Sequence, residues 1–155
     1  MFRGILAIQD TFYNPVLFIS LFTWALAQAI KVPIGYWVEH RLNWGLLFSS
    51  GGMPSSHSAL MAATTLSIGL FYGFNTPVFA LAFAISMVVI YDATGVRREA
   101  GRHAEKINLL INEFFSGNPI SDERLKEVIG HTPRQVTAGV ALGIIIPLIF
   151  FFFLK

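Results

Sequence analysis

The sequence has no cysteine and few charged residues, and each scarcity excludes a class of protein. Without cysteine, the chain has neither disulfide bridges nor thiolate metal sites. Only 13% of the 155 residues are charged, whereas a soluble domain carries about 25%. Apolar residues make up 54% of the chain, and 15 residues are phenylalanine. This composition predicts a protein that is dissolved mainly in lipid.

Four apolar segments reach or approach the ~20 residues that a helix needs to cross a bilayer. They cover approximately residues 14–30, 56–74, 76–91 and 133–154, and the first continues to residue 38 if Lys31 is tolerated within it. Only the sequence GFNTP separates the second segment from the third, which predicts a tight antiparallel hairpin. Residues 1–10 lack the basic, apolar and small-residue regions of a signal peptide. We therefore expect a single domain, residues 1–155, that folds as an all-α integral membrane bundle of about four transmembrane helices.

The long charged segment between the third and fourth spans has a helical pattern of its own. Its apolar residues recur at helical spacing, opposite a polar face, which predicts an amphipathic helix on the membrane surface. The apolar face holds Ile107, Leu110, Ile111 and Phe114, and the polar face holds Arg102, Lys106, Asn108 and Glu113. Asn118 and Pro119 interrupt this helix, and Ser121 is placed to cap a second one that runs to Ile129.

Basic residues are unevenly divided between the two faces that four spans would create. One face holds Lys31, Arg41, Arg97, Arg98, Arg102, Lys106, Arg124, Lys126 and Arg134, and the other holds Arg3 and Lys155. Under the positive-inside rule, the charged loops are cytoplasmic and both termini are outside. Anion binding is an alternative explanation for much of this uneven distribution of basic residues.

The sequence GGMPSSHSA, from Gly51 to Ala59, stands directly before the second span. Glycines such as Gly52 let the backbone approach an anion closely, and the start of the following helix favours negative charge. Ser55 and Ser56 add hydroxyl donors, and His57 adds a group that titrates near neutrality. The structural alternative is a serine-capped helix behind a flexible turn. His57 favours a phosphate-binding loop, because ionisable groups near a span are costly.

A second histidine, His131, stands just before the fourth span in the sequence GHTPRQVTAG. Lys31 lies near the end of the first span, and Arg97 and Arg98 follow the third. Together with the two histidines, these residues bring a polar group from every span to one face. Two histidines and several cations suit a phosphoryl group, with one imidazole attacking phosphorus and the other protonating the leaving oxygen. A hydrolytic dyad of His131 with one of the loop serines is an alternative chemistry.

These motifs resemble those of the type-2 phosphatidic acid phosphatase superfamily, which includes the vanadium haloperoxidases. PSSH, residues 54–57, is similar to the PSGH motif of the superfamily, and HTPRQVTAG, residues 131–139, is similar to its third motif. Together with YDATGVRREAG, residues 91–101, they resemble the divergent branch of small bacterial and plastid membrane proteins. The resemblance covers about residues 27–143.

The resemblance implies a role for each matching position. His131 would be the nucleophile that forms a phosphohistidine, and His57 would be the general acid. The phosphate would be held by Ser55 and the backbone around Ser56, and Lys31 is the best match to the lysine of the first motif. Superfamily members act without a metal, so we expect none here.

The chain also departs from the superfamily pattern at several positions. Nine residues separate Lys31 from Arg41, where the first motif has six, and no proline follows Arg41. Leu125 stands where the third motif has an arginine, so Arg97 and Arg98 are expected to supply that group across an insertion, with Arg124 as the competing candidate. Gln135 replaces the aspartate that orients the nucleophile. Asp92 and Glu127 are the alternative sources of a carboxylate.

The leading interpretation is a membrane phosphatase for a lipid phosphomonoester such as phosphatidylglycerol phosphate or phosphatidic acid. The alternative is a non-catalytic protein that binds or transports lipid phosphates. The expected location is a bacterial inner membrane or a plastid membrane, with the site on the cytoplasmic face. The partners expected are the lipid substrate, membrane lipids and a second copy of the chain that completes the site, with no nucleic acid.

Overall fold

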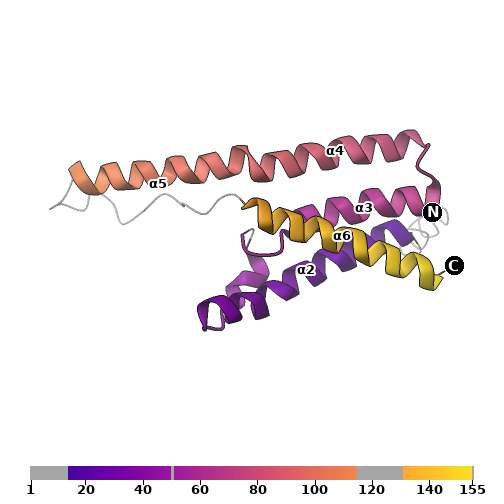
Figure 1. The fold of residues 1–155 in the computed structure, drawn as a ribbon, viewed down its shortest axis with the longest axis horizontal. Helices are drawn as coiled ribbons and strands as arrows, with labels where there is room; N and C mark the ends of the chain where they lie inside the picture. Colours follow the sequence, from indigo (N-terminus) through magenta and orange to yellow (C-terminus); the bar gives the residue numbers. More distant parts are fainter. Residues whose placement is uncertain (1–13, 50, 115–130, 155) are drawn as a thin grey trace, which may run out of the picture.

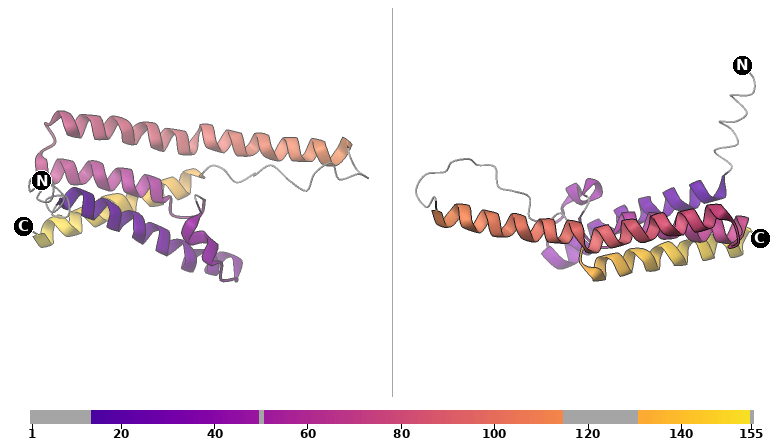
Figure 2. Two further views of the ribbon diagram at one scale, coloured as in Figure 1. Left: turned by 180° about the vertical axis from the view of Figure 1, so that it is seen from behind. Right: turned by 90° about the horizontal axis from the view of Figure 1, so that it is seen from above.

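The computed structural model describes residues 14–49, 51–114 and 131–154, and within these ranges every regular element is a helix (Figure 1). The elements are α2 (Pro15–Glu39), the 3₁₀ helix η1 (Trp44–Phe48), α3 (Ser56–Tyr72), α4 (Pro77–Thr94), α5 (Val96–Phe114) and α6 (Pro133–Leu154). Helices α2, α3, α4 and α6 run side by side, as the two further views confirm (Figure 2). The predicted all-α bundle is therefore confirmed.

Short polar residues begin the long helices at the positions that the sequence favours. The Asn14 side chain accepts hydrogen bonds from the backbone N–H groups of Val16 and Leu17 at the start of α2. Thr76 caps α4 in the same way, and a proline follows each of these two caps. Such caps satisfy N–H groups that have no partner within the helix, which matters most where lipid replaces water. The Gly73–Thr76 turn forms the predicted hairpin between α3 and α4.

Helix α3 is the centre of the bundle and packs against α2, α4 and α6. Its buried positions are occupied by small or hydroxyl-bearing residues: Ser56, Ser58, Ala59, Ala63, Thr65, Ser67 and Gly69. Small side chains allow neighbouring helix backbones to approach closely, which is how helices associate inside a membrane. The other helices therefore surround α3.

The closest of these contacts joins α3 to α6 through two glycines spaced four residues apart, Gly139 and Gly143. A Cβ atom at Gly139 would overlap the carbonyl oxygen of Ser55. A Cβ atom at Gly143 would lie 2.7 Å from the Cβ of Ala62 and 3.0 Å from the backbone N of Ala63. The GxxxG spacing on α6 thus fits the small-residue face of α3 without room for a methyl group.

Hydroxyl groups tie α3 to the other two helices. The Thr64 hydroxyl donates to the Ser20 hydroxyl on α2 at 2.9 Å. The Thr65 and Ser86 hydroxyls, from α3 and α4, are 2.7 Å apart, and Ser86 also donates to the carbonyl oxygen of Met61 at 3.2 Å. Interhelical hydrogen bonds of this kind contribute about 0.6 kcal/mol each in a membrane protein. They fix the rotation of each helix about its axis more than they stabilise the bundle.

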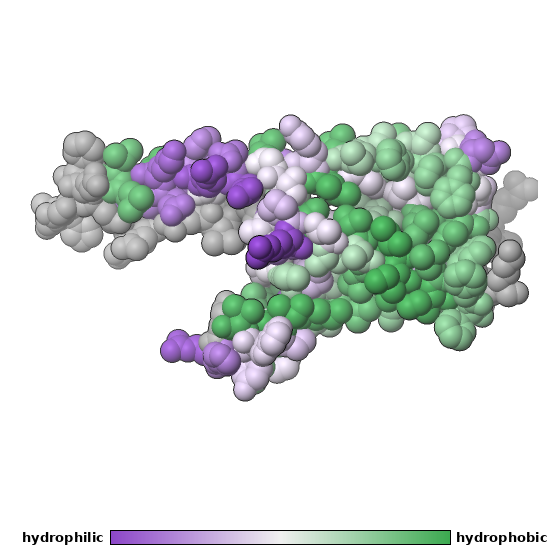
Figure 3. All heavy atoms as spheres, in the orientation of Figure 1, coloured by the Kyte–Doolittle hydropathy of each residue, from purple (hydrophilic) through white to green (hydrophobic). Residues whose placement is uncertain are grey.

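Three helical segments among the described residues are long and apolar enough to cross a membrane: Pro15–Val38, Pro77–Ile111 and Pro133–Phe153. The apolar side chains cover the face of the bundle seen in Figure 3, away from the polar end. Helix α3, the predicted second span, has 17 residues and is about 26 Å long at ~1.5 Å per residue. It is shorter than the other three, and they shield it from lipid.

Helix α5 confirms the predicted amphipathic helix but begins earlier than expected, at Val96. Only Gly95 separates it from α4, and the two form one long rod that extends beyond the other helices (Figures 1 and 2). Its polar residues form the purple region on this projection in Figure 3. Whether α5 lies on the membrane surface stays a prediction. The predicted helix 121–129 lies outside the described residues.

The α3–α6 contact gives a first prediction. Gly143→Leu should lower the free energy of unfolding by about 1–3 kcal/mol, because the side chain would force the two backbones apart. Thermal unfolding of the protein in detergent measures the effect. Ala141→Leu, at an exposed position on the same helix, is the matched control and should leave stability nearly unchanged. Equal unfolding temperatures for the two variants would contradict the close contact.

Candidate functional site

One end of the bundle brings together residues from all four long helices. The backbone N–H of Ser55, at the start of α3, donates to the carbonyl oxygen of Gln135 on α6 at 2.9 Å. The backbone N–H of His131 donates to the carbonyl oxygen of Ala93, near the end of α4, at 3.1 Å. Lys31 of α2 reaches the Ser56 hydroxyl at 3.4 Å. The end of α4 and the starts of α3 and α6 thus meet beside Lys31.

The Lys31 side chain is almost fully buried, with 1% of its surface exposed. Its Nζ donates to the carbonyl oxygen of Ser49 at 2.9 Å and, more weakly, to the Ser56 hydroxyl. Among the described residues, no carboxylate forms a salt bridge with it. An ammonium removed from water without a counter-ion is costly, and a bound anion would compensate that cost. Lys31 is therefore the strongest single indication of an anion site.

A pocket of about 170 Å³ opens beside this ammonium. The residues that line it are Lys31, Ile34, Gly35, Val38, Leu46, Gly52, Met53 and Gln135. Since a water molecule occupies ~30 Å³ of liquid, the pocket has room for a group equal in size to a few waters. Lys31 and Gln135 provide its polar side chains, and α2 and η1 provide most of its apolar wall.

The loop between η1 and α3 contains a glycine with positive φ and a serine that caps α3. Gly52 adopts φ 87°, a backbone conformation that favours glycine, and lies against the Lys31 side chain. Ser55 caps α3, since its hydroxyl accepts from the N–H of Ser58 at 3.4 Å and from the Ser58 hydroxyl at 2.9 Å. The structural alternative, a serine-capped helix, is therefore present. Phosphate binding by the same loop stays a prediction.

His131 is held by a hydrogen-bonded turn at the start of α6. The Thr132 hydroxyl accepts from the backbone N–H of Gln135 at 3.4 Å, and Gln135 Oε1 accepts from the backbone N–H of Thr132 at 2.9 Å. This reciprocal pair is a capping box. It also fixes the amide orientation, because a backbone N–H requires an oxygen opposite it.

The same Gln135 oxygen lies 3.2 Å from Nδ1 of His131. An amide oxygen is only an acceptor, so Nδ1 must carry the proton in this hydrogen bond. A neutral imidazole then has its lone pair on Nε2. Gln135 thereby orients the ring and favours the tautomer with the proton on Nδ1.

His57 is exposed in the first turn of α3, two residues after Ser55. The Ser55 N–H to Gln135 bond and the Gln135 to His131 contact connect the two histidine-bearing segments through a single glutamine. The two segments, 74 positions apart in the chain, are thus neighbours at the same end of the bundle.

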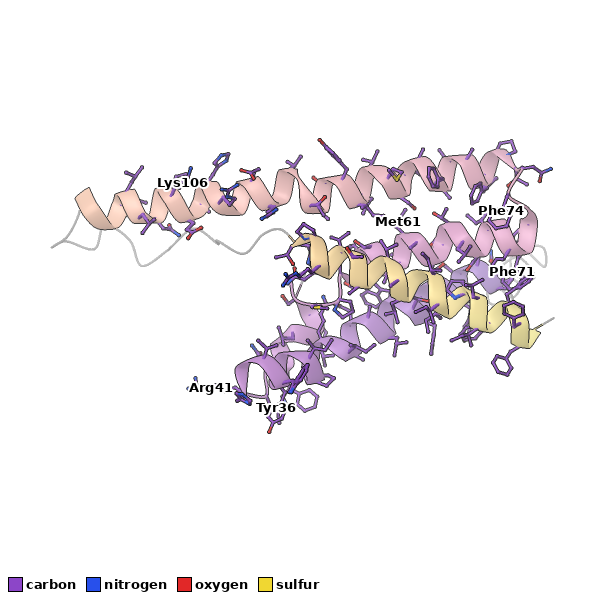
Figure 4. The ribbon with its side chains drawn as sticks, viewed as in Figure 1. Tyr36, Arg41, Met61, Phe71, Phe74 and Lys106 are labelled. Carbon is purple, nitrogen blue, oxygen red and sulfur yellow. The ribbon has the colours of Figure 1, made fainter. Side chains whose placement is uncertain are left out.

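The remaining predicted residues are placed less centrally. Arg41 is exposed beyond the end of α2 and does not line the pocket (Figure 4). Arg98 is exposed on α5, and Asp92 is half-buried near the end of α4. Arg97 lies on α5, but its side chain is outside the described part of the structure, as are Glu127 and Arg124.

Two features of the site were missed in the sequence. Gln28, one turn before Lys31 on α2, donates from Nε2 to the carbonyl oxygen of Leu47 at 2.9 Å and so holds η1 against α2. The glycine pair of α6 brings that helix close to Ser55. The i, i+3 spacing of Gln28 and Lys31 and the GxxxG spacing are signals that a closer reading would have used.

Comparisons with known proteins identify the family of the chain. Residues 12–146 match the Divergent PAP2 family. The chain belongs to this family. A relative in Bacillus subtilis (strain 168), "Uncharacterized membrane protein YuiD", is 37% identical over 151 residues, which cover 90% of this chain and 96% of the relative. No solved structure matches.

Family membership makes the chain a membrane protein of the PAP2 superfamily and confirms the resemblance drawn from the motifs at residues 54–57 and 131–139. The matched range contains Lys31, His57 and His131 and ends after the glycine pair of α6. Within residues 14–49, 51–114 and 131–154, no three His, Cys, Asp or Glu side chains cluster as metal ligands would.

The Gln135 contacts generate a second prediction. Gln135→Leu should convert His131 from a predominantly Nδ1-protonated ring to a mixture of tautomers, because the acceptor is lost. Nitrogen NMR of ¹⁵N-histidine-labelled protein distinguishes protonated from unprotonated ring nitrogens. Thr132→Val is the matched control, since it removes the cap hydroxyl but keeps the N–H that orients Gln135. An unchanged His131 spectrum in Gln135→Leu would show that the amide does not select the tautomer.

Proposed function

We propose that the protein is a metal-independent phosphatase that hydrolyses a lipid phosphomonoester through a phosphohistidine intermediate. The observation that carries the proposal is the buried Lys31 ammonium, which has no carboxylate partner among the described residues and faces a pocket beside Ser56 and Gln135. A phosphate in this pocket would provide the missing counter-charge. The positive end of the α3 dipole would stabilise the same anion.

In the proposed first step, Nε2 of His131 attacks phosphorus and the bond from phosphorus to the lipid oxygen breaks. His57 donates a proton to the departing oxygen, which leaves as the lipid alcohol. In the second step, water attacks the phosphohistidine, His57 takes the proton from that water, and inorganic phosphate leaves. Lys31 neutralises the phosphoryl oxygens in both steps, with Arg97 or Arg98 as the proposed second cation.

The position of the site favours a lipid over a soluble ester. Lys31 lies within the candidate span Pro15–Val38, so the phosphate must be bound at the edge of the hydrocarbon layer. A lipid can present its headgroup there while its acyl chains stay in the bilayer. Phosphatidylglycerol phosphate and phosphatidic acid are the substrates that we propose.

The second candidate function is binding or transport of a lipid phosphate without turnover. Gln135 favours it, because a neutral amide stabilises the imidazolium form of His131 less than a carboxylate would. The two functions differ in one chemical outcome: only the phosphatase forms a covalent phosphorus–nitrogen bond at His131.

His131→Ala should reduce phosphate release from phosphatidic acid or phosphatidylglycerol phosphate to background, because the nucleophile is lost. Purified protein in detergent, assayed with a chelator present, measures the release. His40→Ala is the matched control and should retain activity, since His40 is exposed at the end of α2 and does not line the pocket. Acid-labile labelling by ³²P should also disappear in His131→Ala. Equal release by His131→Ala and the wild type would exclude this mechanism.

We further propose that the site faces the cytoplasm, because Lys31, Arg41, Arg134 and the basic helix α5 gather at this end of the bundle. The absence of native cysteine allows a direct test with single cysteines. Glu105→Cys on α5 should react with a membrane-impermeant maleimide only after cells are permeabilised, whereas Asn75→Cys in the α3–α4 turn should react in intact cells. The reverse pattern would place the site outside.

A further inference from the structure

The end of α2 and η1 form a projection next to the pocket whose surface differs from the rest of the bundle. At ~1.5 Å per residue the 25 residues of α2 extend about 37 Å, longer than the ~30 Å hydrocarbon layer. The candidate span ends at Val38, so the last residues of α2 and η1 lie at its boundary. Figure 4 shows Tyr36 and Arg41 at the tip of this projection.

Large apolar side chains cover the projection at this end of the candidate span. Trp37 is 80% exposed, Trp44 is 65% exposed and Phe48 is 92% exposed, and Tyr36 and Leu42 are also exposed. We call this set, together with Arg41, the aromatic lip. Water alone would make such a surface unfavourable, whereas tryptophan and tyrosine are enriched at the depth of lipid headgroups.

The lip is held in place and continues directly into the pocket. Gln28 binds the carbonyl oxygen of Leu47, and Lys31 binds that of Ser49, so the C-terminal end of η1 is fixed to α2. Four residues of the same projection, Ile34, Gly35, Val38 and Leu46, line the Lys31 pocket. The apolar surface of the lip therefore continues into the pocket, and a lipid in contact with the lip could reach the Lys31 ammonium without passing through water.

The lip carries little net charge, since Glu39 precedes Arg41 by two residues at the end of α2. The Arg41 side chain is exposed there. A basic group beside tryptophans is suited to contact lipid phosphates at the headgroup level. The lipid-facing surface of α2, where Leu17 and Leu21 are exposed, is continuous along one helix with the lip.

We infer that the aromatic lip inserts into the headgroup layer of the membrane and admits phosphate-bearing lipids sideways from that leaflet into the Lys31 pocket. This second part rests on the proposed function, and the insertion itself does not. The substrate class is then a phosphomonoester whose acyl chains remain in the membrane. A phosphate ester dissolved in water would gain nothing from the lip.

Tryptophan fluorescence tests the insertion independently of any activity, because the chain has three tryptophans. One variant keeps only Trp44 (Trp24→Phe with Trp37→Phe), and its matched control keeps only Trp24 (Trp37→Phe with Trp44→Phe). Both are reconstituted in phosphatidylcholine–phosphatidylglycerol vesicles that carry quenchers at known depths. Trp44 should be quenched most by shallow labels and Trp24 by deep labels. Quenching of Trp44 by aqueous acrylamide alone would overturn the insertion, and so would protection from both quenchers, which indicates a second copy on the lip.

Activity tests the sideways entry. Trp44→Ser should lower kcat/KM for long-chain phosphatidic acid in vesicles about tenfold, because the lip loses a large apolar contact, and leave kcat/KM for a short-chain, water-soluble analogue unchanged. Tyr72→Ser removes a ring of similar exposure, 59%, at the other end of α3 and should change neither value. Equal losses on both substrates in Trp44→Ser would overturn sideways entry. If the wild type hydrolyses neither substrate, the proposed function fails. The fluorescence result still shows whether the lip inserts into the headgroup layer.

Discussion

The close approach of α6 to α3 is the constraint on which the site depends. Gly139 lets α6 touch the backbone at Ser55, and this contact lies one turn from Gln135, whose carbonyl oxygen binds the Ser55 N–H. Any side chain at Gly139 would move the start of α6, and His131 with it, away from the start of α3. The chemistry proposed for the two histidine segments therefore requires a backbone contact that neither histidine makes.

The polar groups inside the bundle differ in how their hydrogen bonds and charges are satisfied. The hydroxyls of Thr64 and Thr65 in the middle of α3 find partners on α2 and α4, whereas the buried Ser67 hydroxyl has none among the described residues. The helix starts at the site end are capped by Ser55 and by the Thr132–Gln135 pair. Lys31 differs from these groups because it is charged, and in the described part of the chain its ammonium binds only neutral oxygens. A buried charge of this kind is retained where a ligand uses it.

Local patterns in the sequence were sufficient for the four long apolar helices, the hairpin between α3 and α4 and the two histidine motifs that identify the family. They predicted that Lys31 would reach the common face, but not that it would be buried, since burial depends on η1 folding back over α2. Helix η1 has only five residues and no periodic pattern that identifies it. The join of α4 to α5 was missed because Gly95 and the change from apolar to charged residues suggested a boundary, whereas the backbone continues in the same direction. Gln135 was recognised as a replacement for an aspartate, but its role in the capping box requires coordinates.

The exchange of an aspartate for Gln135 changes the charge of the site as well as its geometry. The amide keeps the ring of His131 in the orientation that a carboxylate would impose, and it frees Nε2 of its proton in the same way. It does not add the negative charge that would stabilise an imidazolium, nor one that would repel an incoming phosphate. A site with a neutral amide at this position is more cationic than one with a carboxylate, the more so because Lys31 has no carboxylate partner among the described residues. Such a charge attracts an anion in the ground state as much as in a transition state, which strengthens binding without increasing the rate of a chemical step.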